Sequence, residues 1–132
     1  MNVNKIFICG RITAKPELRT TPSGQSVTTF SVAVNRQWTD KEGMKKEQAE
    51  FFNVVCWGKS AEILVQYADK GQILFVEGRL TTRKWEKNGE KKQSSEIICE
   101  RFQFGPRPMN SKETSATSEQ PKPVDAPDEE NL

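Results

Sequence analysis

Apolar and polar residues alternate along several stretches of the first 104 residues, which is the pattern of strands that bury one face. In residues 27–36, Phe30, Val32 and Val34 alternate with smaller or polar side chains. Four other stretches are rich in apolar, β-branched or aromatic residues and are bounded by turn-forming residues. We therefore predict five strands, over residues 4–12, 27–36, 50–57, 73–82 and 94–104.

One segment has helical rather than strand periodicity. Between residues 60 and 70, Ala61, Leu64 and Ala68 recur at the spacing of one helix face. Ser60 is a suitable N-cap, and Gly71 is suited to the exit from a helix. Five strands with one short helix between the third and the fourth are the layout of an all-β OB-fold barrel.

The connections differ in character. Asn88-Gly89 is the strongest short signal for a tight hairpin, because both residues tolerate positive φ. The segment 21–24, Thr-Pro-Ser-Gly, also has turn chemistry. Residues 39–48, just after the second strand, read as a polar segment with a turn at Gly43.

The chain changes composition after residue 104. Residues 105–132 are rich in Pro, Ser, Thr, Glu and Lys and have few large apolar side chains, so we predict that this part is disordered. We therefore divide the chain into a barrel domain, residues 1–104, and a linker with an acidic tip, residues 105–132. The barrel domain has 17 Lys and Arg against 12 Asp and Glu, and the tail has 3 against 6. A basic body suits a polyanionic partner.

The composition excludes several classes of function. There is no histidine, no CxxC pair and no carboxylate cluster with metal-ligand spacing, so we expect no catalytic residue, no metal and no cofactor. No apolar stretch approaches the ~20 residues of a membrane helix, and the N-terminus does not open a signal peptide. The three cysteines, Cys9, Cys56 and Cys99, read as reduced core thiols of an intracellular protein.

Aromatic residues occur where a water-facing strand face is predicted. On the third strand, Phe51 and Trp57 share a face with the polar Asn53. Trp85 continues the solvent-facing series of the fourth strand into the basic hairpin at Asn88-Gly89. Trp57 could instead pack under the following helix, this face could be a subunit interface, and the hairpin could be an ordinary solvated turn.

Rings on basic strands suit an unpaired nucleic acid. A single strand exposes every base face, and stacking one base on an aromatic side chain is worth roughly 1–3 kcal/mol. Lys and Arg then neutralise phosphates, so that affinity falls as salt rises. This binding tolerates any base sequence and differs from reading of a duplex groove.

The barrel domain also resembles a known family. Its ordered motifs resemble those of the bacterial single-stranded DNA-binding proteins, and the likeness runs from about Met1 to Phe104 without a large gap. The motifs that carry it are Asn4-Lys5, Gly10-Arg11, residues 16–19, residues 21–24, residues 33–36 with Trp38, residues 51–59, Ala61-Glu62, Tyr67, Lys70-Gly71, residues 76–80 and residues 82–85.

The resemblance implies that bases stack on Trp38, Phe51, Trp57 and Trp85. Well-known members have Trp then Phe in the third strand, whereas this chain has Phe then Trp, which keeps two rings on one face. The cations that we expect to contact phosphates are Arg36, Lys59, Arg79, Arg83, Lys84, Lys87, Lys91 and Lys92.

The resemblance further implies a non-enzymatic role in DNA replication, recombination and repair. Members associate, most often as homotetramers, in the cytoplasm and with the nucleoid, without membrane contact. Their acidic tails end in Pro-Phe and dock replication and repair proteins. Here the candidate docking residues are Asp128, Glu129, Glu130 and Leu132, with no terminal aromatic residue. A solubilising tail, a single-stranded RNA binder and an interaction adaptor that acts through the tail remain alternatives.

Overall fold

A computed structural model describes residues 1–106 and 124–125 of the chain. The strands are β1 (Ile6–Ile12), β2 (Arg19–Thr20), β3 (Ser26–Thr39), β4 (Lys45–Trp57), β5 (Ile73–Lys87), β6 (Glu90–Phe104) and β7 (Val124–Asp125), and the helix α1 spans Gly58–Tyr67. The short strand β7 pairs antiparallel with β6. The candidate docking residues Asp128, Glu129, Glu130 and Leu132, and most of the segment predicted to be disordered, lie outside the described residues.

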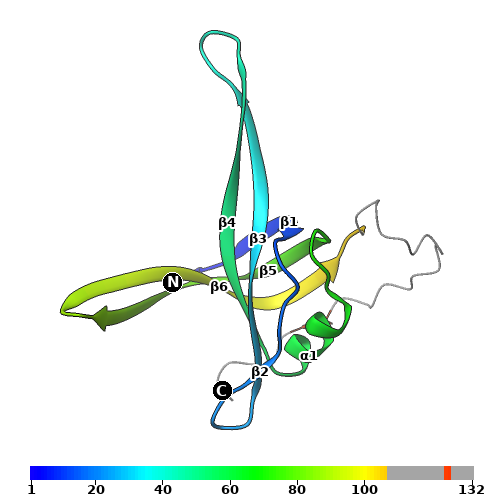
Figure 1. Ribbon diagram of the computed structural model, residues 1–132, viewed down its shortest axis with the longest axis vertical. Coiled ribbons are helices and arrows are strands. Elements are labelled where there is room, and N and C mark those ends of the chain that lie inside the picture. The colour runs from blue at the N-terminus through cyan, green and yellow to red at the C-terminus, as the bar shows by residue number, and fades with distance from the viewer. Residues whose placement is uncertain (107–123, 126–132) are drawn as a thin grey trace.

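Five strands close into a barrel in the order β1-β5-β6-β4-β3, with β3 returning to β1 (Figure 1). Four of the five contacts between neighbouring strands are antiparallel, and β4–β6 is parallel. The helix lies between the third and the fourth strand of this barrel in chain order. The all-β OB-fold prediction is therefore confirmed.

The core is a single apolar cluster inside the barrel. It takes Val32 from β3, Val54 from β4, Leu74 from β5 and Phe102 from β6, all of them fully buried. Leu64 of α1 belongs to the same cluster, so the helix packs against the strands. Burial of these side chains from five elements at once stabilises the closed sheet.

The helix begins earlier than the sequence pattern indicates. It starts at Gly58, directly after Trp57, and Ser60 is buried in its first turn instead of capping it. The last helical residue is Tyr67, and the backbone N–H of Ala68 donates to the Leu64 carbonyl. The predicted bounds of 60–70 were wrong at both ends: strand β4 passes into the helix without a loop, and the backbone of Ala68 is already extended.

The segment predicted to be a polar connection, residues 39–48, instead forms the turn and part of the outer end of a long hairpin. Strands β3 and β4 pair without interruption from Val27↔Trp57 to Thr39↔Lys45. The Asp40 carboxylate closes the turn, because it accepts hydrogen bonds from the backbone N–H groups of Glu42 and Met44. The outer end of this hairpin is exposed on both faces. Its sequence therefore lacks the alternation of apolar and polar residues that identifies a strand with one buried face.

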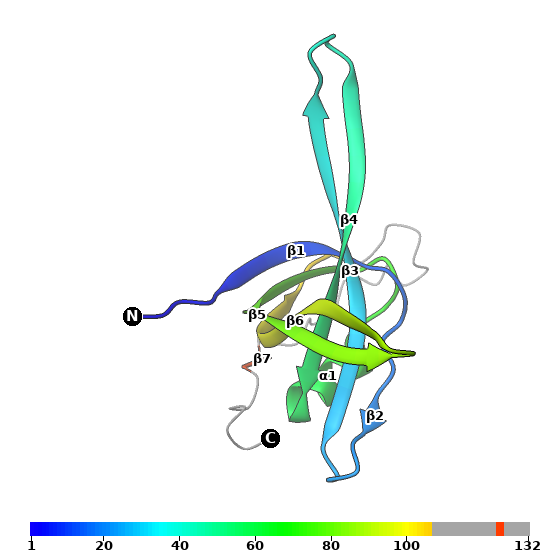
Figure 2. The same cartoon turned by 90° about the vertical axis from the view of Figure 1, so that its left-hand side faces the viewer.

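The second long hairpin joins β5 to β6. It is closed at Asn88 and Gly89, whose φ angles are 53° and 78°, as expected for a two-residue hairpin turn. The two hairpins leave the barrel in different directions, as Figures 1 and 2 show. A third, short hairpin pairs β2 with the start of β3 around the predicted turn at 21–24.

The cysteines divide into two groups. Cys56 on β4 and Cys99 on β6 are buried, and they follow the parallel pairs Val54↔Ile97 and Val55↔Ile98. The hydrogen bond with the Cys56 thiol, together with burial, raises the pKa of Cys99 far above its ordinary value. Cys9 is exposed on β1, so the prediction of a core thiol was wrong at this position.

The register of β5 and β6 shifts from Glu77↔Arg101 to Gly78↔Cys99, so the extra residue of this bulge, Glu100, lies on β6 opposite Gly78 and helps the two strands to bend around the barrel. A methyl group at Gly78 would overlap the backbone carbonyl oxygen of Ile98, which cannot withdraw without disturbing β6.

We therefore expect Gly78→Ala to lower the free energy of unfolding by about 1–3 kcal/mol, measured by urea denaturation. The exposed Thr82→Ala on the same strand should change it by less than about 0.5 kcal/mol, and equal effects would contradict this interpretation of the bulge.

Candidate nucleic-acid interface

Trp38 lies on the outer arm of β3, beyond the barrel. Its cross-strand partner on β4 is Lys46. The guanidinium carbon of Arg36, two residues earlier on the same side of the strand, lies 5.2 Å from the centre of the ring. Arg36 also forms an ion pair with Glu50 at 4.0 Å. The ring is thus oriented by its strand and by a cation, without a core around it.

Trp85 has the same surroundings on the hairpin of β5 and β6. Lys92 is its cross-strand partner. The guanidinium carbon of Arg83 lies 5.6 Å from the ring centre, and an Arg83 nitrogen lies 3.8 Å from a Glu96 carboxylate oxygen. Trp85 therefore does not fold back onto the barrel as an ordinary apolar side chain would.

A hollow adjoins each of these tryptophans. The one at Trp38 measures about 460 Å³ and is lined by Gln37, Trp38, Thr39, Lys45, Lys46 and Glu47. The one at Trp85 measures about 530 Å³ and is lined by Lys84, Trp85, Glu86, Lys91, Lys92 and Gln93. Each hollow joins an aromatic face to lysine ammonium groups, which suits a base with its attached phosphate.

The two rings of β4 are not equally accessible. Phe51 is 66% exposed and lies beside the exposed Asn53 on the same side of the strand. Trp57 is partly buried at the junction with α1, and Val55 between them is buried. The predicted water-facing side of this strand is therefore confined to its outer half.

Strand register decides which rings share a side of the β3–β4 ribbon. Trp38 pairs with Lys46, so its side chain is on the same side of the ribbon as the core residue Val32 and as Phe52, which packs against the core. Phe51 pairs with Ala33 and points to the other side. A polymer that contacts both Trp38 and Phe51 has to pass around this twisted ribbon.

The predicted phosphate-contacting cations are spread over β3, α1, β5 and β6. Lys84, Lys87, Lys91 and Lys92 are all exposed on the hairpin of β5 and β6. Lys59 is exposed at the start of α1, and Arg79 is half-buried on β5. Arg36 and Arg83 differ from the others, since each lies over a tryptophan.

Two features of this surface escaped the sequence reasoning. Lys45 and Lys46 line the hollow at Trp38 as residues of strand β4, whereas the sequence pattern placed them in a polar segment between strands. The other is the Arg-x-Trp spacing, which occurs at 36–38 and again at 83–85. Residues two apart on a strand share a side, so this spacing could have predicted the two arginine–tryptophan contacts.

A separate apolar surface lies on β1 and β5. Phe7, 59% exposed, and Phe75, 37% exposed, stack with ring centres 6.3 Å apart. Cys9 is the cross-strand partner of Phe75, which extends this surface, here named the β1 patch (Phe7, Cys9 and Phe75). Of the described strands, β5 alone pairs with residues 6–9 of β1, and β3 reaches β1 only from Gly10 onward, so the opposite edge of residues 6–9 is open.

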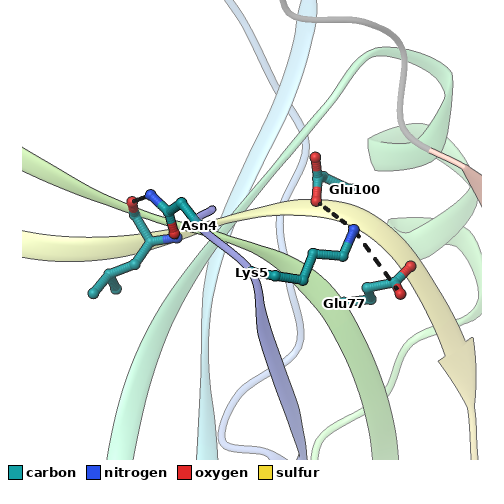
Figure 3. A network of polar contacts seen from close by, with 5 residues as sticks. Asn4, Lys5, Glu77 and Glu100 are labelled. Atoms are coloured by element: carbon teal, nitrogen blue, oxygen red, sulfur yellow. Dashed lines mark hydrogen bonds and ion pairs between the residues drawn. The ribbon is translucent and has the colours of Figure 1, made fainter. Parts of the chain in front are cut away.

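Polar contacts hold the chain just before the β1 patch (Figure 3). The Asn4 side chain donates to the Leu80 carbonyl at 2.8 Å and accepts from the Leu80 N–H at 3.0 Å. The Lys5 ammonium donates a hydrogen bond to the Glu100 carboxylate at 3.0 Å and lies 3.9 Å from a Glu77 carboxylate oxygen. The hydrogen bond with Glu100 raises the pKa of Lys5. This segment therefore continues the pairing of β1 with β5 beyond the strand's first residue.

Residues 1–106 and 124–125 contain no group of three or more potential metal ligands. Among the same residues there is also no helix that is long and apolar enough to cross a membrane.

Comparison with known proteins supplies independent information. The profile of the "Single-strand binding protein family" matches residues 3–105. "Single-stranded DNA-binding protein 2" of Streptococcus agalactiae is 45% identical over 101 residues, 76% of this chain and 76% of that protein. "Single-stranded DNA-binding protein" of Aquifex aeolicus is 37% identical over 123 residues, 93% of this chain and 84% of that protein.

A solved structure agrees with these sequence matches. "Plasmodium falciparum SSB complex with ssDNA" has a TM-score of 0.74 and 32% identity, over 80% of this chain and 97% of that one. Both the fold and the family are therefore established by likeness over most of the described residues.

Proposed function

The chain belongs to the single-strand binding protein family, and on that premise we propose that it binds single-stranded DNA without sequence preference. The bound strand is held by stacking of bases on aromatic rings and by phosphate contacts to Lys and Arg. Coating of this kind protects exposed DNA during replication, recombination and repair. The protein acts by binding and not as an enzyme, in the cytoplasm and with the nucleoid.

The observation that carries this proposal is the placement of Trp38 and Trp85. Each ring stands on a two-stranded arm outside the barrel, next to a hollow that contains lysine side chains. Duplex DNA keeps its base faces inside the stack, so such rings have no base to contact there. Phe51 and Trp57 on β4, between the arm and the helix, extend the set of candidate stacking residues.

Two alternatives follow from the same fold. A single-stranded RNA binder would use the same rings, because the stacking surfaces of the bases do not differ between the two polymers. An interaction adaptor would use the barrel only as a platform and the acidic tail to bind partners.

Titration with oligo-dT separates these possibilities. We expect oligo-dT to quench the tryptophan fluorescence in a saturable manner, with an affinity that falls steeply as salt rises. A duplex of the same length should bind with an affinity at least about tenfold lower at each salt concentration, because its base faces are not accessible to the rings. Absence of quenching at low salt, or equal affinity for the duplex, would refute the proposal and favour the adaptor. Preference for oligo-U over oligo-dT would identify an RNA binder.

The β1 patch supports a further part of the proposal, which is that copies of the chain associate, most simply into a homotetramer. An open strand edge is a template for pairing with another strand. Exposed Phe7 and Phe75 beside that edge would be removed from water by a second copy. Several associated barrels would also offer more arms to one long strand of DNA.

The acidic tip of the chain is proposed to dock replication and repair proteins. Asp128, Glu129 and Glu130 suit a basic rim, and Leu132 suits an apolar pocket. Leu fills such a pocket less well than the terminal Phe of the resembled family, so we expect weaker docking by this tail.

Association through the β1 patch can be tested by sedimentation velocity. We expect the wild-type chain to sediment as an assembly well above its 15.0 kDa monomer mass. Phe7→Glu should shift it to the monomer, because a carboxylate would be buried unpaired at the contact. Met44→Glu is the matched control, since it introduces the same charge at an apolar side chain of similar exposure, 58%, in the turn between β3 and β4. A monomeric wild type, or an assembly that survives Phe7→Glu, would contradict this part of the proposal.

A further inference from the structure

Four residue types recur in the same arrangement on the two long hairpins. On each arm an arginine lies over the tryptophan that follows it by two residues, a lysine is the cross-strand partner of the tryptophan, and a glutamate on the other strand pairs with the arginine. The two sets are Arg36, Trp38, Lys46 and Glu50 on β3–β4, and Arg83, Trp85, Lys92 and Glu96 on β5–β6.

The hollows repeat as well. Each is lined by three successive cross-strand pairs whose central pair is the tryptophan and its lysine, Trp38↔Lys46 in one and Trp85↔Lys92 in the other. Among the described residues that line either hollow there is no arginine. Each arginine is one strand repeat nearer the barrel than its tryptophan, whereas the lining of each hollow is centred on the tryptophan–lysine pair and extends one pair to either side.

The exposure of the rings agrees with this arrangement. Trp38 and Trp85 are only 38% and 40% exposed, although they project from arms that do not pack on the core. A guanidinium within about 6 Å of a ring centre is attracted to the ring face and covers part of it. The carboxylates of Glu50 and Glu96 lie 4.0 and 3.8 Å from guanidinium nitrogens of Arg36 and Arg83 and offset part of their charge.

We propose that Arg36 and Arg83 are positioning residues, each covering one face of its tryptophan so that a base of the bound strand stacks on the opposite face, beside the hollow. This inference deepens the proposed function and rests on it. It replaces the sequence-based interpretation of these two arginines as phosphate contacts. A phosphate placed at either guanidinium would also be close to a glutamate carboxylate, which opposes that contact. The lysines that line the hollows are better placed to meet the backbone of the strand.

The salt dependence of binding distinguishes the two roles. Each phosphate contact to a single strand contributes about 0.7 to the slope of log affinity against log salt. We expect Arg36→Gln and Arg83→Gln to weaken oligo-dT binding about two- to fivefold, the range expected for loss of an exposed cation–ring contact, at every salt concentration and without a change in slope. The matched control is Lys84→Gln, which removes a neighbouring charge that does not contact a ring and should lower the slope. Arginine variants that lower the slope as much as this control would overturn the inference.

Collisional quenching of the free protein supplies a second readout. With one ring face uncovered, Arg36→Gln and Arg83→Gln should each raise the acrylamide quenching constant, measured in a Trp57→Phe background so that only the two arm tryptophans emit. Arg36→Lys and Arg83→Lys keep the charge but lose the planar group, so they should raise it as well. Unchanged quenching in all four variants would also overturn the inference. This measurement needs no DNA, so it tests the cover of the rings independently of DNA binding. The proposed function is refuted separately, if the wild-type protein does not bind oligo-dT.

Discussion

The parallel pairing of β4 with β6 is the contact on which the rest of the molecule depends. The pairs Val54↔Ile97 and Val55↔Ile98 close the sheet into a barrel. Strand β4 belongs to one long hairpin and β6 to the other. This contact therefore also joins the two hairpins where they leave the barrel. Parallel strands cannot be joined by a short turn, and the pairing instead comes from burial of both strands in one core. The positions of the outer tryptophans relative to each other are set at this point.

The arms solve a different physical problem, which is to hold an aromatic ring ready in water. Within the core, close packing fixes side-chain orientation, but Trp38 and Trp85 have no such surroundings. Their orientation comes from the strand ladder, from the arginine over each ring and from the glutamate that restrains it. A ring restrained in this way loses less conformational entropy when a base stacks on it. The same construction on both arms supports the proposal that both tryptophans stack on bases of one bound strand.

Sequence reasoning recovered the barrel because its strands carry a buried face, and burial leaves a period of two in the chain. It did not recover the outer halves of β3 and β4. Both faces of these strands are exposed there, for example at Lys45 and Gln48, so the sequence has no alternation of buried and exposed residues. The Asn88-Gly89 turn was predictable because it depends on local backbone chemistry alone. The opposite placement of Trp38 and Phe51 was not predictable, because it depends on a register that continues through the misassigned segment.

The central claim is that the tryptophans on the arms stack on the bases of a single strand. Proton–nitrogen correlation spectra resolve the three indole N–H groups, which Trp→Phe variants assign to Trp38, Trp57 and Trp85. Addition of oligo-dT is expected to shift the signals of Trp38 and Trp85 in a saturable manner, while a blunt duplex at the same concentration leaves them in place. Signals of Trp38 and Trp85 that do not move when oligo-dT is bound would contradict the account, whatever the affinity.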